Sequence, residues 1–231
     1  VWVSVPSLSP SSKIIAYWGN DANISVPSYR TDGSLWSGFD GVWHLEDTND
    51  SSANSRTATG NGGISAGVSS LVGKGSSVDG VDDDFSVNGY NGITGGNART
   101  ISLWVKSSQT SGGFMGWGTS GDFWNFGWNP TGPQVQIGGG AVEQGLFNLS
   151  DDQWHHLAVS FPGTSSDLNE TKLFVDGNIV DAPASSSSGT INTASGSALR
   201  IGSFYNGISR LAGMLDEVRI SSVARGDAWI K

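Results

Sequence analysis

The chain has 231 residues, which suits one large all-β domain or two small ones, and it contains no cysteine, so disulfides and thiolate metal sites are excluded. Lys and Arg total 12 against 21 Asp and Glu, a formal net charge of −9 that repels phosphate backbones and argues against a nucleic-acid partner. No apolar run approaches the roughly 20 residues of a membrane span, so we expect no membrane insertion.

The elements predicted along the chain are short strands. Gly is the commonest turn former, with 34 residues, and few segments show helical spacing. Dipeptides such as Asp79-Gly80 and Asp176-Gly177 favour the positive φ angles of tight turns. The Ser/Gly tracts at 50–77 and 185–189 are typical of loops, and only the final VARGDAWIK is compatible with a helical turn. In chain order the predicted strands are Lys13–Trp18, Gly41–Leu45, Thr100–Lys106, Phe123–Trp128, Gln134–Gly138, Trp154–Phe161, Thr171–Val175, Ala198–Ile201 and Gly213–Ile220.

This pattern predicts an all-β fold, a two-sheet antiparallel β-sandwich. Residues 1–40 differ in texture, with two strand-like runs around a Pro/Ser turn and then a polar connector. Because a hairpin alone is marginal in water, we expect this segment to belong to a preceding module, with the main domain at 41–231.

The stretch GDFWNFGWNP at 121–130 places Trp124, Phe126 and Trp128 at alternate positions. Alternate residues of a strand face one side, so these rings either fill the core or form a platform on which a sugar stacks. Trp117 lies in a Gly-rich stretch, where we expect a hairpin that reaches the surface. Aromatic faces and side-chain amides suit a neutral or weakly charged glycan. The candidate ligand-binding residues are Trp117, Trp124, Asn125, Trp128, Gln134 and Gln136.

Five stretches, in order, resemble the laminin-G-like (concanavalin-A-like) jelly-roll family. They are GVWHLEDTNDSSANSRTATG at 41–60, SVDGVDDDFSV at 77–87, TISLWVKS at 100–107, WHHLAVSF with KLFVDGNIV within 154–180, and LRIGSFYNG with LAGMLDEVRISSVARGDAWI within 199–230. The resemblance implies two stacked antiparallel sheets, one convex and one concave, and commonly a structural calcium ion. The leader WVSVPSLSPSSKIIAYWGN is similar to the end of a bacterial domain of unknown function that often precedes such jelly rolls in exported proteins.

Calcium prefers carboxylate, amide and carbonyl oxygens. The loop HLEDTNDSSAN is rich in such groups, and the resemblance implies a ligand on the last strand, which Asp216 matches. We therefore predict a calcium site at Glu46, Asp50 and Asp216. In the alternative, Asp50 and Asn54 only stabilise a turn. The acids of DGVDDD at 79–84 offer a second ion site, although the family pattern places a hairpin turn there.

A hydrolytic site is disfavoured by the sequence. Related glycan hydrolases need two carboxylates on one strand, and none of the four Glu residues has another Glu within five positions. The segments GISAG at 63–67 and GWGTSG at 116–121 match nucleophile and dinucleotide motifs by letter, but neither has the helix that those motifs require.

The sequence thus favours a non-catalytic binding module of a larger exported bacterial protein. We expect a secreted or cell-surface location, a glycan or another cell-surface ligand, and other domains of the same parent chain as partners. Two alternatives remain, a structural spacer of a surface protein and a glycan-active enzyme.

Overall fold

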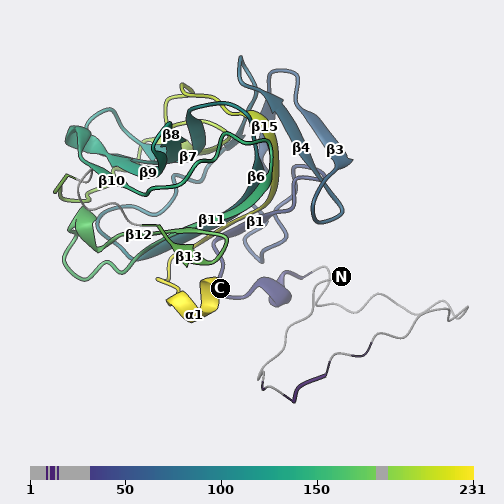
Figure 1. The fold of residues 1–231 in the computed structure, drawn as a ribbon, viewed down its shortest axis with the longest axis horizontal. Coiled ribbons are helices and arrows are strands. Elements are labelled where there is room, and N and C mark those ends of the chain that lie inside the picture. The colour runs from purple at the N-terminus through teal and green to yellow at the C-terminus, as the bar shows by residue number, and fades with distance from the viewer. Residues whose placement is uncertain (1–8, 10, 14, 16–31, 181–186) are drawn as a thin grey trace, which may run out of the picture.

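The computed structural model describes residues 9, 11–13, 15, 32–180 and 187–231. The predicted strand Lys13–Trp18 falls largely outside these residues. Within them the chain forms two antiparallel sheets, as predicted (Figure 1). None of the helices in this part of the chain is long and apolar enough to cross a membrane.

Sheet A follows the order β13-β12-β11-β6-β15-β4-β3, and β1 pairs with the second half of β15. Its strands curve around the side on which sheet B lies (Figure 1). Their bounds are β13 Asn178–Ile179, β12 Lys172–Val175, β11 Trp154–Phe161, β6 Arg99–Lys106, β15 Ala212–Ser221, β4 Lys74–Asp79, β3 Ser65–Ser69 and β1 Gly41–Trp43.

Sheet B follows the order β10-β9-β8-β7-β14-β5-β2. Its strands are β10 Val142–Gln144, β9 Gly132–Ile137, β8 Phe123–Asn129, β7 Gly112–Gly118, β14 Ser197–Ile201, β5 Asp84–Val87 and β2 Thr59–Asn61. Short helical turns complete the described fold: η2 Ser34–Trp36, η3 Gly138–Gly140, η4 Leu168–Glu170 and the terminal α1 Asp227–Ile230.

The core lies between the sheets and follows the alternation of each strand. In β6, Ile101, Leu103 and Val105 are buried against sheet B, whereas Trp104 and Lys106 are half-buried on the opposite face. The consecutive strands β11 and β12 pair antiparallel, with Leu157 opposite Val175.

The expectation that residues 50–77 form only loops is wrong, because β2, β3 and the start of β4 lie there. These strands lack the β-branched pattern that marks a strand in sequence. Pairing with neighbouring strands and small buried side chains hold them instead: Ser76 is fully buried in β4, and its hydroxyl donates to the carbonyl oxygen of Leu45 at 2.8 Å.

The described end of the N-terminal segment packs on the outer face of sheet A. The Phe39 ring lies 6.0 Å from that of Trp229, and the Arg225 guanidinium donates to the Gly38 carbonyl at 3.0 Å. On the same face Ile230 of α1 packs on Ala158 and Phe174. The outer face of sheet B carries none of these contacts.

Candidate functional site

The side chains of β8 divide between core and surface according to strand parity. Trp124, Phe126 and Trp128 point into the core and are at most 1% exposed. The intervening Phe123 and Asn125 face outward. Of the two readings of the aromatic alternation, the structure therefore supports the core.

Trp117 does not reach the surface, so that expectation is wrong. It lies in β7, which is a full strand rather than a hairpin tip, and it is 0% exposed. Its ring stacks on Trp124 at 6.2 Å, and its Nε1 donates to the Ile93 carbonyl at 2.9 Å. Trp128 stacks on Phe114 at 4.7 Å. Trp117, Trp124 and Trp128 thus offer no ring face to a ligand in solution.

The three predicted amides lie together on the outer face of sheet B. In register, Arg200 of β14 pairs with Gly116 of β7, Gly116 with Asn125 of β8, and Asn125 with Gln136 of β9. We call these four residues the outer row. Gln134 precedes Gln136 by two positions in β9, so both side chains lie on the same face of the sheet. Sequence spacing could not place Arg200 in this row, because it is 75 residues from Asn125 and only the strand order brings them together.

A loop at 202–210 lies across the outer row and carries an aromatic ring onto it. The glycine at 116 makes this possible, since a Cβ there would overlap the backbone nitrogen of Tyr205. That same nitrogen donates to Oδ1 of Asn125 at 2.9 Å. Asn125 is only 3% exposed, so it fixes the loop rather than facing solvent.

Tyr205 stacks on Phe123, with ring centroids 4.8 Å apart and planes at 8°. Both rings are half-buried, and both lie on the outer side of sheet B. The sequence reasoning missed this pair. Phe123 shares the parity of Asn125, which was an available signal, whereas nothing local in SFYNG indicates where Tyr205 lies.

The other two predicted amides, Gln134 and Gln136, differ in solvent exposure. Gln134 is 5% exposed, and its Oε1 accepts from Nδ2 of Asn129 at 3.0 Å. Asn129 also donates to Gln144. Gln136 is half-buried and beside Asn125. The accessible part of the predicted site is therefore Gln136, next to the Phe123–Tyr205 stack.

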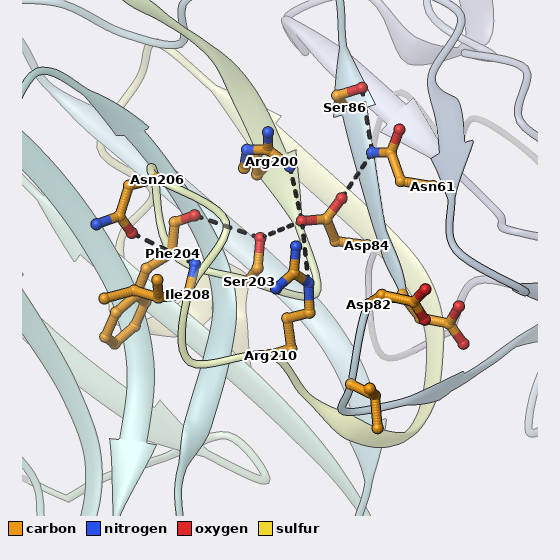
Figure 2. Close-up of polar contacts among 12 residues, drawn as sticks. Asn61, Asp82, Asp84, Ser86, Arg200, Ser203, Phe204, Asn206, Ile208 and Arg210 are labelled. Carbon is orange, nitrogen blue, oxygen red and sulfur yellow. Dashed lines mark hydrogen bonds and ion pairs between the residues drawn. The ribbon is translucent and has the colours of Figure 1, made fainter.

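Next to the outer row is a buried ionic cluster around Asp84 (Figure 2). The side chain of Asp84 is 0% exposed, and Oδ2 lies 2.7 Å from Nη1 of Arg200 and 3.8 Å from Nε of Arg210. Ser203 and Asn61 donate to the same carboxylate at 2.9 and 2.6 Å. Asp84 therefore holds both arginines and the start of the 202–210 loop at one place on sheet B.

The predicted metal ligands Glu46, Asp50 and Asp216 are not brought together. Among the described residues, three acids with oxygens within 4.8 Å of one another occur only at Asp79, Asp82 and Asp83. This is the stretch for which sequence offered a second ion site. It is also the β4–β5 hairpin turn that the family pattern implied.

Asp50 and one oxygen of Asp216 instead accept hydrogen bonds, while Oδ1 of Asp216 is buried and has no partner among the described residues. Asp50 accepts from four donors in and around its own loop, including the backbone nitrogens of Val42 and Arg56 at 2.9 Å. These contacts support the alternative in which Asp50 stabilises a turn. Asp216 is 0% exposed, and its Oδ2 accepts from Ser70 and Val72 at 2.8 Å. Burial raises the pKa of Asp216. Glu46 is exposed.

One arginine lies within the core rather than near the outer row. Arg99 is 0% exposed, its guanidinium lies 4.8 Å from the Trp124 ring, and it donates to the Gly95 carbonyl at 2.7 Å and to Thr193 at 3.0 Å. Burial lowers the pKa of Arg99 to about 9. Arg99 therefore ties the segments around Gly95 and Thr193 to the core and cannot contact a surface ligand.

The two sheets, their strand order and the buried aromatic core define a jelly-roll β-sandwich of the lectin type. The model of a laminin-G-type family, described as the concanavalin A-like lectin/glucanases superfamily, matches residues 79–231. The chain belongs to this superfamily, as its sequence motifs predicted. A search of curated proteins found no significant match.

Solved structures show the same fold at low identity. Domain 4 of AbnA, an extracellular arabinanase from Geobacillus stearothermophilus solved with arabinotriose, aligns with a TM-score of 0.64 at 21% identity, covering 83% of this chain and 96% of that one. The binding domain of Paraclostridial Mosquitocidal Protein 1 gives 0.63 at 13%, over 84% and 50%. The receptor-binding domain of botulinum neurotoxin C/D mosaic serotype gives 0.59 at 11%, over 84% and 50%. The chain thus spans about half the length of the two toxin domains, and these similarities show the fold alone.

Proposed function

We propose that this domain is a non-catalytic module that binds a glycan, or another cell-surface ligand, on the outer face of sheet B. The observation that carries the proposal is the half-exposed Phe123–Tyr205 stack beside Gln136. In the same proposal the domain is secreted or displayed at the cell surface as part of a larger bacterial protein, following the remnant of another module at residues 1–40.

The chemistry of this surface fits a sugar ring. The apolar face of a pyranose or furanose packs on an aromatic ring, while an amide both donates to and accepts from hydroxyl groups. Asn125 strengthens the arrangement because it fixes Tyr205 through the backbone and leaves the ring outside. Such preorganisation lowers the ordering cost of binding.

Three structures of similar fold support this assignment by analogy only. One was solved with arabinotriose and the other two are described as binding or receptor-binding domains. We therefore take arabino-oligosaccharides as the first probes for this chain.

The proposal excludes hydrolysis on chemical grounds. A glycosidase needs two carboxyl groups facing one ligand, one of them as acid. Asp84, the acid nearest to the outer row, is shielded by two arginines and is fully buried. Release of reducing ends from a polysaccharide panel by the pure protein would overturn this part of the proposal.

The binding test compares single variants by calorimetry, after a glycan array has identified binders. Tyr205→Ala and Gln136→Ala should each weaken binding about five- to tenfold, because each removes one contact worth roughly 1–1.5 kcal/mol. Trp229→Ala is the matched aromatic control, since Trp229 is 46% exposed on the sheet A side. If no glycan binds, the spacer alternative replaces this proposal. If a glycan binds and Tyr205→Ala binds it as tightly as the parent protein and Trp229→Ala do, the site does not lie at the Phe123–Tyr205 stack.

Calcium enters the proposal at Asp79, Asp82 and Asp83. Their carboxylates can supply three of the six to eight oxygens that the ion prefers, and the backbone of Val81 lowers the pKa of Asp79, which favours its charged form. A chelator should then lower the melting temperature, because a ligand of the folded state stabilises it by mass action. Asp82→Asn should remove that response, whereas Asp47→Asn, in another exposed loop, should keep it. A melting curve that calcium and chelator leave unchanged would contradict the assignment.

A further inference from the structure

Two arginines share one carboxylate at the edge of the outer row. The side chains of Arg200 and Arg210 are 29% and 28% exposed, whereas that of Asp84 is 0% exposed (Figure 2). Two guanidinium groups against one carboxylate leave one unit of positive charge uncompensated inside this cluster. This surplus faces the outside of sheet B in a chain whose net charge is −9.

Arg210 is the less satisfied of the two arginines. Its Nε is buried and has no hydrogen-bond partner among the described residues; the nearest carboxylate oxygen, on Asp84, is 3.8 Å away. Arg200 by contrast donates directly to Asp84 at 2.7 Å. Asp84 therefore holds Arg210 less firmly than it holds Arg200, and the exposed part of the Arg210 side chain has the freer guanidinium of the pair.

Neighbouring acids do not complete the pair. Asp83 is turned to the backbone, with its two oxygens accepting from the nitrogens of Gly63 and Asp79. The Asp82 side chain points away from the arginines (Figure 2). These acids lower the potential around the hairpin, but none of them contacts Arg200 or Arg210.

The arginine pair is continuous with the proposed ligand surface. Arg200 is itself a member of the outer row, two strands from Asn125. Gly207 belongs to the loop that carries Tyr205, and a Cβ on it would lie 3.3 Å from Arg200 and 3.4 Å from Arg210. The 202–210 loop therefore connects the Tyr205 ring and both guanidinium groups on the same face of sheet B.

We propose that Arg200 and Arg210 form an anion subsite, and that the ligand of the outer face carries a carboxylate or a sulfate group on the sugar next to the one that stacks. This inference rests on the proposed function. It differs from the sequence expectation of a neutral or weakly charged glycan, which rested on the aromatics and amides of the 114–136 region, because both arginines come from residues 200–210.

The test is calorimetric titration in calcium-free buffer with three oligosaccharides of one backbone: neutral, carrying a uronate, and carrying a sulfate. At least one anionic form should bind about tenfold more tightly than the neutral form, the gain expected of one charge-assisted contact at a half-exposed site. The uronate and sulfate arms identify the group. The preference should shrink as salt is raised.

Arg210→Gln should remove the preference and leave binding of the neutral form within about twofold of the parent, because Arg210 lies outside the outer row and makes no hydrogen bond to Asp84. Arg200→Gln should also remove the preference. Arg56→Gln is the matched control, because Arg56 has the same 28% side-chain exposure beside Asp40 and lies outside the cluster. It should keep the preference. If either glutamine variant fails to fold, Arg210→Lys replaces that variant. Lysine keeps the positive charge but lacks the paired donors of the guanidinium, so Arg210→Lys should retain only part of the preference.

Other outcomes decide between this inference and the proposed function. Equal affinity for neutral and anionic forms, or a preference that survives in both glutamine variants, overturns the anion subsite alone. A preference that appears only when calcium is added also overturns it, since the acidic hairpin would then bridge to the ligand. If no oligosaccharide binds but inorganic sulfate shifts the Nε–H NMR signals of Arg200 and Arg210, the anion site stands and the proposed function fails.

Discussion

Neighbouring residues in β8 have opposite roles. Phe123 faces outward and stacks on Tyr205, while Trp124, one position on, is fully buried against Trp117. Composition alone cannot separate the two, because both are large aromatics with strong strand preference. Only the parity of each residue along the strand decides whether its side chain lies on the outer face or in the core.

The first prediction compares these two neighbours. Trp124→Ala should lower the free energy of unfolding by about 3–5 kcal/mol, because it opens a large cavity in the core. Phe123→Ala should cost about 1 kcal/mol, the value of an aromatic pair outside the core. Urea denaturation measures both. Equal losses would mean that the two rings are equally buried and that the outer face has been assigned to the wrong parity.

A second prediction at the residue scale concerns His156 and the dependence of stability on pH. It is half-buried on the outer face of sheet A, 5.2 Å from the ring of Trp104, and burial, together with the charge of Arg219, lowers its pKa below the ordinary 6.5. The unfolded chain therefore takes up a proton near pH 6.5 while the folded chain resists it. Stability present above pH 6.5 should be lost as the pH falls toward the lowered pKa.

Denaturation at pH 8 and pH 5.5 tests this linkage. The loss of unfolding free energy on acidification should be smaller in His156→Gln than in the parent. His156 is the right position because its neighbour His155 is already tied to Asp176 at 2.8 Å. Parallel pH profiles for parent and variant would contradict the prediction.

At the scale of elements, a glycine-rich strand supports the proposed ligand surface. The strand β7 reads as a loop in sequence because Gly occupies four of its seven positions, yet all seven residues are buried. Its missing side chains give the 202–210 loop its place on the sheet. The small side chains of β2, β3 and β4 also explain why these strands were not predicted, because strand prediction relies on the alternation of apolar and polar side chains.

Gly116→Ala tests the role of β7 as the support for this loop. The new Cβ would overlap the nitrogen of Tyr205 and Oδ1 of Asn125, so the loop must move. We expect a loss of about 1–3 kcal/mol of stability and a loss of glycan binding that exceeds the loss of stability. Gly121→Ala is the control, since a Cβ there meets nothing within 4 Å. Normal binding by Gly116→Ala would show that the ligand does not use Tyr205.

At the scale of the whole molecule, much of the fold could be predicted from sequence and the site only in part. Strands such as Trp154–Phe161 show alternation or ordered family motifs, and these fix the sandwich. Asn125, Gln134 and Gln136 were predicted for their amide chemistry, and the pairing of β8 with β9 places all three on the outer face of sheet B. Tyr205, Arg200 and Arg210 could not be found, because their place depends on a strand order that sets β14 beside β7.

The two outer faces of the sandwich also differ in what covers them. On sheet A the described N-terminal residues and α1 occupy the surface, with Arg225 4.7 Å from the ring of Trp229. On sheet B the 202–210 loop leaves the Phe123–Tyr205 stack and Gln136 partly open. A ligand site on sheet B would therefore leave sheet A for contacts within the parent chain.

The central claim is that this outer face of sheet B binds the ligand. NMR of the folded domain, labelled in aromatic side chains and side-chain amides, tests it most directly during titration with arabinotriose and the tightest binder of the array. We predict shifts in Phe123, Tyr205 and Gln136, with no change in the core signals of Trp124 and Trp128. Shifts confined to Trp104 and His156 on sheet A, or no shift at all with a ligand that binds by calorimetry, would contradict it.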